Sequence, residues 1–207
     1  MKFKLVVLFL FVYAICGYSQ DIQLLANFNN KSFGITNIIE KDINSKWDYF
    51  SLSEVGSAYN DKSNMQFESN QFFNYSLKNN FALTTGFGLQ NDNIVPQIGI
   101  SYENEHNNWT YAFYPTLNYS FSDKQLGASL NSIIEFSPSI NGNWDFYSLA
   151  LLDFDYVFGK NFFSQQSINI GLQYKEKFQF GVNIEFEQED NFNDSSVESG
   201  VFLGFSF

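Results

Sequence analysis

Residues 200–207 read Gly-Val-Phe-Leu-Gly-Phe-Ser-Phe and alternate between two kinds of side chain. Val201, Leu203, Phe205 and Phe207 fall on one parity, whereas glycine, serine and a single phenylalanine fall on the other. Because successive side chains of a β-strand point to opposite faces, this stretch predicts a strand with one apolar face.

The same alternation returns in many earlier segments. In 109–121 the odd positions carry only aromatic residues, proline and leucine, and the even positions carry mainly threonine, alanine, asparagine and serine. Segments 164–174 and 178–187 repeat this pattern, and short stretches rich in Asn, Asp, Gly, Lys and Ser separate the segments. The chain is therefore predicted to be all-β, with antiparallel neighbours joined by tight turns.

Aromatic residues mark both ends of several segments, as Trp109 and Tyr119 do in one and Trp144 and Tyr156 in another. Such end markers are typical of the interfacial girdles of membrane β-barrels. Aromatic residues make up 20% of the chain, which suits a barrel with an apolar outside and a polar inside. We therefore expect an antiparallel up-and-down transmembrane β-barrel. A soluble barrel or a lipocalin-like binder is the alternative at the level of the fold.

The amino-terminal residues 1–19 are predicted to be a secretory signal peptide. Lys2 and Lys4 supply a positive start, an apolar run follows up to Cys16, and Gly17-Tyr18-Ser19 offers a small-x-small cleavage site. The alternative is a lipoprotein acylated at Cys16, but the preceding Ile15 is bulkier than such sites prefer.

Counting the alternating segments predicts about ten strands in a barrel domain that covers 47–207. These strands are 47–59, 64–77, 80–90, 94–104, 109–121, 125–137, 144–158, 164–175, 177–188 and 198–207. Residues 20–46 are expected to form a periplasmic extension, in which the isoleucines from Ile35 to Ile43 fall near helical spacing. The alternative makes 22–29 and 32–39 a further hairpin and yields twelve strands.

This pattern resembles the small outer-membrane β-barrel proteins of Gram-negative bacteria over residues 47–207. The resemblance implies export to the cell outer membrane and contact with outer-membrane lipid. It also implies recognition by the barrel assembly machinery, with Phe205 and Phe207 as the assembly signal. The class includes anchors, pores and enzymes, so the resemblance leaves the activity open.

The parity of the predicted strands directs several carboxylates into the lumen. The acidic candidates for lumen-lining positions are Glu68, Glu135, Asp145, Asp153, Asp155 and Glu185. Bulky residues share the inward parity: Tyr114, Ile133, Tyr147, Leu149, Leu151 and Phe202. Small barrels are filled by their own side chains, so we expect a filled lumen. The alternative is a narrow conduit that prefers cations.

Catalytic residues, metal sites and cofactors are not predicted. The single histidine, His106, is expected in a turn and has no evident nucleophile beside it. The acidic stretch from Glu187 to Glu198 is expected to be a solvated loop, with calcium binding as the alternative. The 22 acidic residues face 11 lysines and no arginine, which makes nucleic acid a poor partner.

Two prolines are candidates for a lateral seam, because proline cannot donate a ladder hydrogen bond. If a turn centres on His106, Pro96 and Pro115 fall nearly opposite each other on adjacent strands. The pair would then mark either a lipid-accessible opening or a bulge that bends the wall.

These features favour a non-enzymatic outer-membrane β-barrel with a structural or interaction role and a side-chain-filled lumen. Its protein partner, periplasmic or within the outer membrane, is not identified by the sequence. A small cation-preferring pore or transporter is the alternative, and a lipid-acting outer-membrane enzyme is the third possibility.

Overall fold

The computed structural model describes residues 21–60, 65–90, 93–122, 124–158, 162–189 and 194–207. The described part of the chain contains no helix long and apolar enough to cross a membrane.

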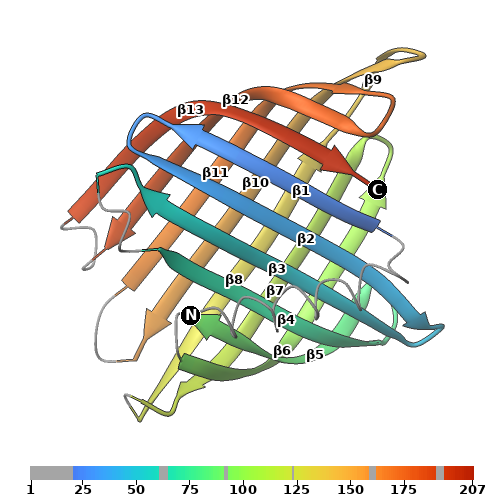
Figure 1. Cartoon of the computed structure of the whole chain (residues 1–207). Coiled ribbons are helices and arrows are strands. Elements are labelled where there is room, and N and C mark those ends of the chain that lie inside the picture. The colour runs from blue at the N-terminus through green and yellow to red at the C-terminus, as the bar shows by residue number, and fades with distance from the viewer. Residues whose placement is uncertain (1–20, 61–64, 91–92, 123, 159–161, 190–193) are drawn as a thin grey trace, which may run out of the picture.

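The described residues form thirteen strands, which belong to one antiparallel sheet (Figure 1). They are β1 (Asp21–Asn29), β2 (Ser32–Asn44), β3 (Trp47–Ala58), β4 (Gln66–Ser76), β5 (Phe81–Gln90), β6 (Asn93–His106), β7 (Trp109–Ser120), β8 (Gln125–Phe136), β9 (Ser139–Asn141), β10 (Trp144–Val157), β11 (Phe162–Tyr174), β12 (Phe178–Glu189) and β13 (Asp194–Ser206).

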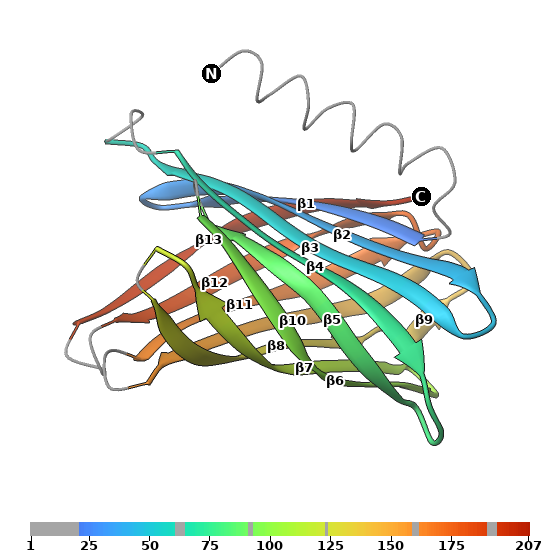
Figure 2. The ribbon, with the colours of Figure 1, turned by 90° about the horizontal axis from the view of Figure 1, so that it is seen from below.

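Twelve of these strands close into a barrel. Each strand pairs with its neighbour in sequence, apart from the short β9, and β1 pairs with β13 to complete the ring. The two perpendicular views show β1–β4 on one wall and the later strands around the lumen (Figures 1 and 2). The three-residue β9 pairs only with the start of β10 and lies outside the ring.

The prediction of ten strands is therefore wrong, and the alternative of twelve fits. Residues 20–46 do not form a periplasmic extension, because β1 and β2 belong to the barrel wall. Ile35 lies on the outer face of β2, Ile38 points into the lumen core, and Ile43 lies at a bulge near the end of the strand. Isoleucines on both faces of one strand produced the apparent helical spacing. The predicted signal peptide, 1–19, lies outside the described residues.

The last strand, β13, begins four residues earlier than the sequence predicted, at Asp194 instead of residue 198, and β12 ends at Glu189. Glu187 pairs with Ser196 and Glu189 pairs with Asp194, so most of the stretch from Glu187 to Glu198 is strand. The prediction of a long acidic loop there is wrong. Polar residues occur on both parities in this stretch, which hid the strand pattern.

Aromatic side chains ring both ends of the barrel. We call the end that carries Asp21 and Phe207 the inner end, and the opposite end the outer end. Ring pairs at the inner end are Trp47–Tyr75 (5.1 Å between centroids), Trp109–Phe136 (4.3 Å) and Trp144–Tyr174 (4.8 Å). Ring pairs at the outer end are Phe33–Tyr59 (6.4 Å), Tyr119–Phe121 (5.2 Å) and Tyr156–Phe158 (5.6 Å). Two such rings are expected where a barrel meets the two interfaces of a bilayer.

Glycines make room for large residues in the lumen. Gly171 on β11 is directly opposite Gly181 on β12. Tyr147 on β10 pairs with Gly171, and Phe202 on β13 pairs with Gly181. The rings of Tyr147 and Phe202 lie 5.8 Å apart across this row, so two side chains from separated strands meet where the intervening strands carry none.

The glycine row predicts a stability effect. In Gly181→Ala the new methyl group would lie 2.1 Å from the carbonyl oxygen of Ile170, so the two strands must shift. We expect the free energy of unfolding to fall by about 1–3 kcal/mol, as overpacking usually does. The measurement is the urea midpoint at which the folded, faster-migrating gel band disappears. Gly142→Ala is the control, because nothing lies within 4 Å of the added carbon. Equal midpoints for the two variants would contradict the prediction.

Candidate functional site in the barrel lumen

The register places all six acidic candidates on the inward parity, but it divides them between two levels. Glu135 and Asp145 lie near the inner end, where Glu135 is opposite Thr110 and Asp145 is opposite Gln173. The other four candidates lie toward the outer end: Glu68, Asp153, Asp155 and Glu185. The six residues therefore do not form one site.

A plug of apolar and aromatic side chains separates the two levels. Phe50, Phe72 and Tyr114 form a three-ring stack, with centroids 6.2 Å apart for Phe50–Phe72, 4.5 Å for Phe50–Tyr114 and 5.1 Å for Phe72–Tyr114. All three are buried, and the same cluster includes Leu25, Ile38, Ala112, Ile133, Tyr147, Leu149, Leu151 and Phe202. We call this cluster the ring plug.

Polar contacts anchor the ring plug on its inner side. The Tyr114 hydroxyl donates a hydrogen bond to Glu103 Oε1 at 2.8 Å. The side-chain amide of Gln23 donates to the Tyr147 hydroxyl oxygen at 2.8 Å. Both rings therefore have their polar atoms paired while the ring bodies fill the lumen.

The sequence identified six of the eleven members of the ring plug, and its two missed aromatic members are Phe50 and Phe72. These two residues lie on β3 and β4, where outward-facing Tyr49 and Phe73 are also aromatic. With aromatic residues on both parities, the apolar signal did not indicate which face was inside. The directly opposed pair Phe50–Phe72 is visible only once the register is known.

Three cavities among the described residues lie in the outer half of the lumen. The largest of these three, about 520 Å³, is lined by five carboxylates together with Gln66 and Gln165: Glu54, Glu68, Glu185, Glu187 and Glu198. We call this cavity the acidic vestibule. A second cavity of about 240 Å³ is lined by Glu68, Asp153 and Asp155, and a small one of about 40 Å³ also touches Glu68 and Asp153.

Neutral donors hold the vestibule carboxylates in place. Ser32 Oγ donates to Glu198 at 2.6 Å, Asn27 Nδ2 to Glu185 at 3.2 Å, and Gln165 Nε2 to Glu54 at 3.4 Å. Sequence analysis missed Glu54, Glu187 and Glu198. Glu54 follows the mixed parity of β3, and the other two were assigned to a loop that is strand.

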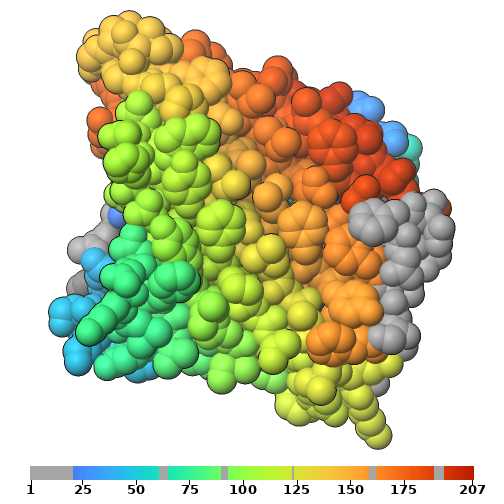
Figure 3. Space-filling model, turned by 180° about the vertical axis from the view of Figure 1, so that it is seen from behind, coloured from blue at the N-terminus to red at the C-terminus, as the bar shows by residue number. Residues whose placement is uncertain are grey.

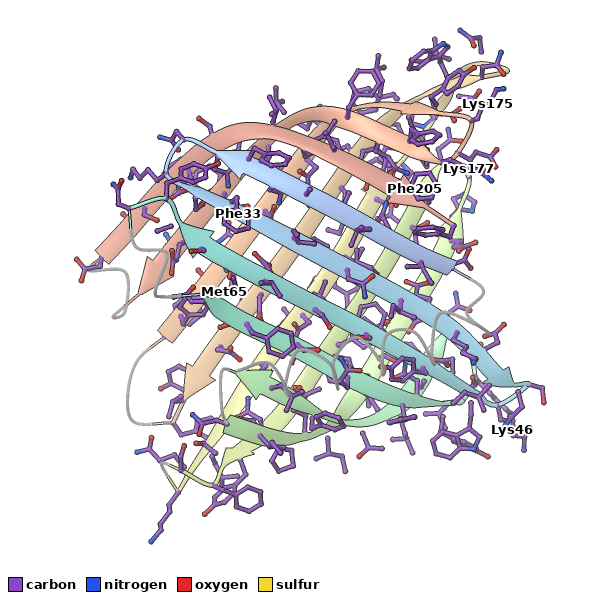
Figure 4. The ribbon with its side chains drawn as sticks, viewed as in Figure 1. Phe33, Lys46, Met65, Lys175, Lys177 and Phe205 are labelled. Atoms are coloured by element: carbon purple, nitrogen blue, oxygen red, sulfur yellow. The ribbon has the colours of Figure 1, made fainter. Side chains whose placement is uncertain are left out.

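None of the described lysine side chains points into the lumen. The described lysines lie in turns or on the outer face of β2: Lys31, Lys41, Lys46, Lys78, Lys124, Lys175 and Lys177. Lys46, Lys175 and Lys177 mark the inner end, opposite to Phe33 and Met65 (Figure 4). The lumen field therefore comes from carboxylates and neutral dipoles, which favours cations over anions.

Asp153 and Asp155 follow each other on the inward face of β10. Asp155 accepts a hydrogen bond from the Ser129 hydroxyl. Asp153 Oδ1 is buried with no hydrogen-bond partner among the described residues, and the same is true of Nδ2 of Asn131, its cross-strand neighbour. Among the described residues, no group of three or more His, Cys, Asp or Glu has an arrangement that could hold a metal ion.

His106 ends β6 and is opposite Trp109 across the turn Asn107–Asn108. It is exposed at the inner end, whereas all three cavities lie in the outer half. His106 therefore does not line any of these cavities.

The two prolines do not face each other as predicted. Pro96 pairs with Phe87 of β5 and Pro115 with Leu130 of β8. Between β6 and β7, Gln97 is opposite Asn118, because the turn centres beyond His106.

The β6–β7 ladder is interrupted beside Pro115, where the missing N–H is expected to break it. The strands stay close at this point, since a Cβ on Gly99 would lie 2.1 Å from the Pro115 carbonyl oxygen. The far wall is likewise covered by packed side chains in the space-filling view (Figure 3).

Phe205 lies on the outer face of β13, with its ring 4.8 Å from that of Phe178 and 4.5 Å from that of Phe207. The backbone N–H of Phe207 donates to the carbonyl oxygen of Ile22 at 3.0 Å. The terminal residues thus sit at the closing seam, and their role as an assembly signal stays a prediction.

Neither protein-family models nor curated protein sequences match this chain. Several solved structures do match this chain. The KdgM porin is 13% identical with a TM-score of 0.50, and the match covers 90% of this chain and 99% of that one. A KdgM porin in complex with disordered oligogalacturonate is 14% identical with the same TM-score and coverage. The NanC porin is 10% identical with a TM-score of 0.51, covering 90% and 98%. At these identities the likeness concerns the fold alone. Together with the closed barrel and its two aromatic rings, it shows that the protein has the fold of the outer-membrane β-barrels.

Proposed function

We propose that this protein is a non-enzymatic outer-membrane barrel with a structural or interaction role, whose lumen does not conduct at rest. The observation that carries the proposal is the ring plug, in which the Phe50–Phe72–Tyr114 stack and the Tyr147–Phe202 pair fill the section between the two polar levels. Close-packed aromatic rings leave no continuous path for hydrated ions.

The arrangement of polar groups supports a non-enzymatic role. General-base catalysis by His106 requires a substrate within hydrogen-bond reach, and its place at the inner end separates it from every cavity described above. The carboxylates Asp153 and Asp155 line a cavity whose other polar residues are Glu68, several amides and three serines, of which Ser129 donates its hydroxyl hydrogen bond to Asp155. That set lacks an evident activated nucleophile.

A small cation-preferring pore is the second candidate, favoured by the acidic vestibule. Its five carboxylates face the outer mouth of the lumen, where they would attract cations and repel polyanions such as oligogalacturonate. In this candidate function the ring plug acts as a gate, and its rings must move before ions pass.

The ring plug predicts that the lumen is closed to ions. The purified barrel is expected to give no steady single-channel current in a planar bilayer, because the ring plug blocks the lumen. Phe50→Ala/Phe72→Ala/Tyr114→Ala is expected to conduct steadily, because it removes the whole stack. If the triple variant does not fold, as judged by the absence of heat-modifiable gel mobility, Phe72→Ala alone is tested in its place.

The control for this experiment is Phe73→Ala/Tyr111→Ala, which removes two rings from the outer faces of β4 and β7, the strands that carry Phe72 and Tyr114. It is expected to stay closed. Steady current through the unmodified protein would overturn the sealed-lumen proposal and favour the pore.

The carboxylates of the acidic vestibule are predicted to set the ion preference of the opened lumen through their charge and not through their volume. In the opened triple variant, Glu54→Gln/Glu68→Gln/Glu185→Gln is expected to move the reversal potential in a KCl gradient toward zero, since it removes three lumen charges at nearly constant volume. Glu176→Gln, in the β11–β12 turn, is the control and should leave the potential unchanged. If both changes have the same effect, the vestibule does not set ion preference.

A further inference from the structure

Two pairs of glutamates face each other across neighbouring strands in the outer half of the lumen. Glu54 on β3 is directly opposite Glu68 on β4, which we call the β3–β4 pair. Glu185 on β12 is directly opposite Glu198 on β13, which we call the β12–β13 pair. All four side chains are half-buried and line the acidic vestibule. Like charges directly opposite each other destabilise a sheet, so the wall of this cavity holds two repelling pairs.

Asp153 and Asp155 form a third pair, which we call the aspartate pair. They lie two positions apart on the inward face of β10, and both line the cavity of about 240 Å³. Asp155 accepts the hydrogen bond from Ser129, whereas Asp153 Oδ1 is buried and has no hydrogen-bond partner among the described residues. Burying a carboxylate oxygen without a donor is costly, so this oxygen is suited to a donor that the ligand supplies.

The three pairs line adjoining cavities. Glu68 lines all three cavities described above, and the aromatic residue Phe163 lines the two larger ones. The vestibule is bounded by both glutamate pairs, and the cavity of about 240 Å³ is bounded by Glu68 and the aspartate pair. We call the three cavities together the outer compartment. Its largest part, about 520 Å³, is within the range of about 300–1,000 Å³ that is typical of small-molecule sites.

A second buried acceptor without a partner is directed at the β12–β13 pair. Asn27 on β1 is 2% exposed, and its Nδ2 donates to Glu185 Oε1 at 3.2 Å. Its Oδ1 is buried and has no hydrogen-bond partner within the described part of the chain. Oxygen atoms that can accept further hydrogen bonds therefore occur beside the first and the last of the three carboxylate pairs.

The described basic side chains lie away from the interior of the outer compartment. The described lysines are in turns or on the outer face of β2, and His106 is at the inner end. Figure 4 shows Lys46, Lys175 and Lys177 at the opposite end of the barrel from Met65, which directly precedes β4. Within the described residues, the carboxylate pairs therefore have no basic side chain between them inside the lumen.

We propose that the outer compartment binds a linear polyamine, a flexible chain that carries ammonium groups several carbon atoms apart. Each carboxylate pair accepts hydrogen bonds from one ammonium group, and such charge-assisted bonds are among the strongest in proteins. An ammonium group has three donors, so it also reaches the free oxygens of Asp153 and Asn27. The alkyl segments between the ammonium groups pack against Phe163, which lines both larger cavities.

The spacing of the carboxylates favours a polyamine over a metal ion. Among the described residues, no three acidic, histidine or cysteine side chains come together as metal ligands. Ca²⁺ takes about 6 to 8 oxygen ligands at one point, and three separated pairs do not provide such a cluster. A point charge therefore neutralises one pair, whereas a chain with three ammonium groups neutralises all three.

The ring plug closes the outer compartment on its inner side. The smallest cavity is lined by Leu151, which belongs to the ring plug, as well as by Asp153. A polyamine bound to the three pairs is therefore held at the outer end of the lumen. This inference goes beyond the proposed function, because such binding does not depend on whether the ring plug ever opens.

The first test is isothermal titration calorimetry on the purified, folded barrel at constant ionic strength. Spermidine carries three ammonium groups and is expected to bind with a dissociation constant at least about tenfold lower than that of cadaverine, which carries two. Cadaverine and Mg²⁺ carry the same charge, so comparing them isolates the spacing of the charges. We expect cadaverine to bind more tightly than Mg²⁺.

Matched variants locate the site. Glu54→Gln/Glu185→Gln removes one charge from each glutamate pair at nearly constant volume and is expected to raise the spermidine dissociation constant at least about tenfold. Glu135→Gln/Asp145→Asn is the control, because it removes two charges from the lumen near the inner end, and it should leave the constant unchanged. If the first double variant lacks heat-modifiable gel mobility, Glu185→Gln alone is tested.

Stability provides a readout that a purely structural role of the glutamates would not give. Spermidine is expected to raise the urea midpoint of the unmodified barrel, because a ligand that binds only the folded state stabilises it. Glu54→Gln/Glu185→Gln without ligand is expected to have a midpoint no lower than that of the unmodified protein, since it relieves repulsion within both pairs. Its midpoint should respond less to spermidine.

Three results would overturn the proposal: no saturable binding of spermidine, tighter binding of Mg²⁺ than of cadaverine, and an equal loss of affinity in the outer variant and its inner-end control. The last result would mean that the net charge of the barrel, and not the outer compartment, attracts the polyamine. Steady current through the unmodified protein would contradict only the proposed function, so failures of the two ideas are distinguishable.

Discussion

The pairing of β1 with β13 is the interaction on which the rest of the structure depends. A bilayer offers no water to the N–H and C=O groups of an open sheet edge, so a membrane sheet must close. Seven residue pairs, from Gln23↔Ser206 to Asn29↔Gly200, make that closure between segments at opposite ends of the described chain. Closure then sets which strands are neighbours and which side chains meet inside.

The need for the ring plug follows from the width of the barrel that closure creates. Twelve strands enclose a wider lumen than the eight-stranded type that ordinary side chains fill. Large rings from β3, β4, β7, β10 and β13 occupy this extra space, and Gly171 and Gly181 keep the intervening strands out of their way. Packing inside the barrel is thus shared between bulky residues on some strands and missing side chains on others.

Charge and polarity are distributed unevenly around this scaffold. Inside, carboxylates gather in the outer half of the lumen, and the described lysines remain in the turns or on the outer face. Outside, hydrogen-bonding groups gather on β2–β5, whereas residues such as Ile98 and Leu117 present an apolar surface elsewhere. The carboxylates inside influence which ions approach the lumen. The hydrogen-bonding groups outside influence which molecules contact the wall.

The sequence by itself determined most of the strands from Trp47 onward, the apolar outer face and the inward direction of residues such as Glu68 and Asp153. These follow from parity, which is a local property of an extended chain. Tertiary structure alone decided the number of strands in the ring, the meeting of Phe50, Phe72 and Tyr114, and the adjacency of Ser51, Ser69 and Gln71. Each of these depends on strand register and on the β1–β13 closure. The alternation of side chains along one strand carries no information about either, because it is the same in every register that differs by two residues.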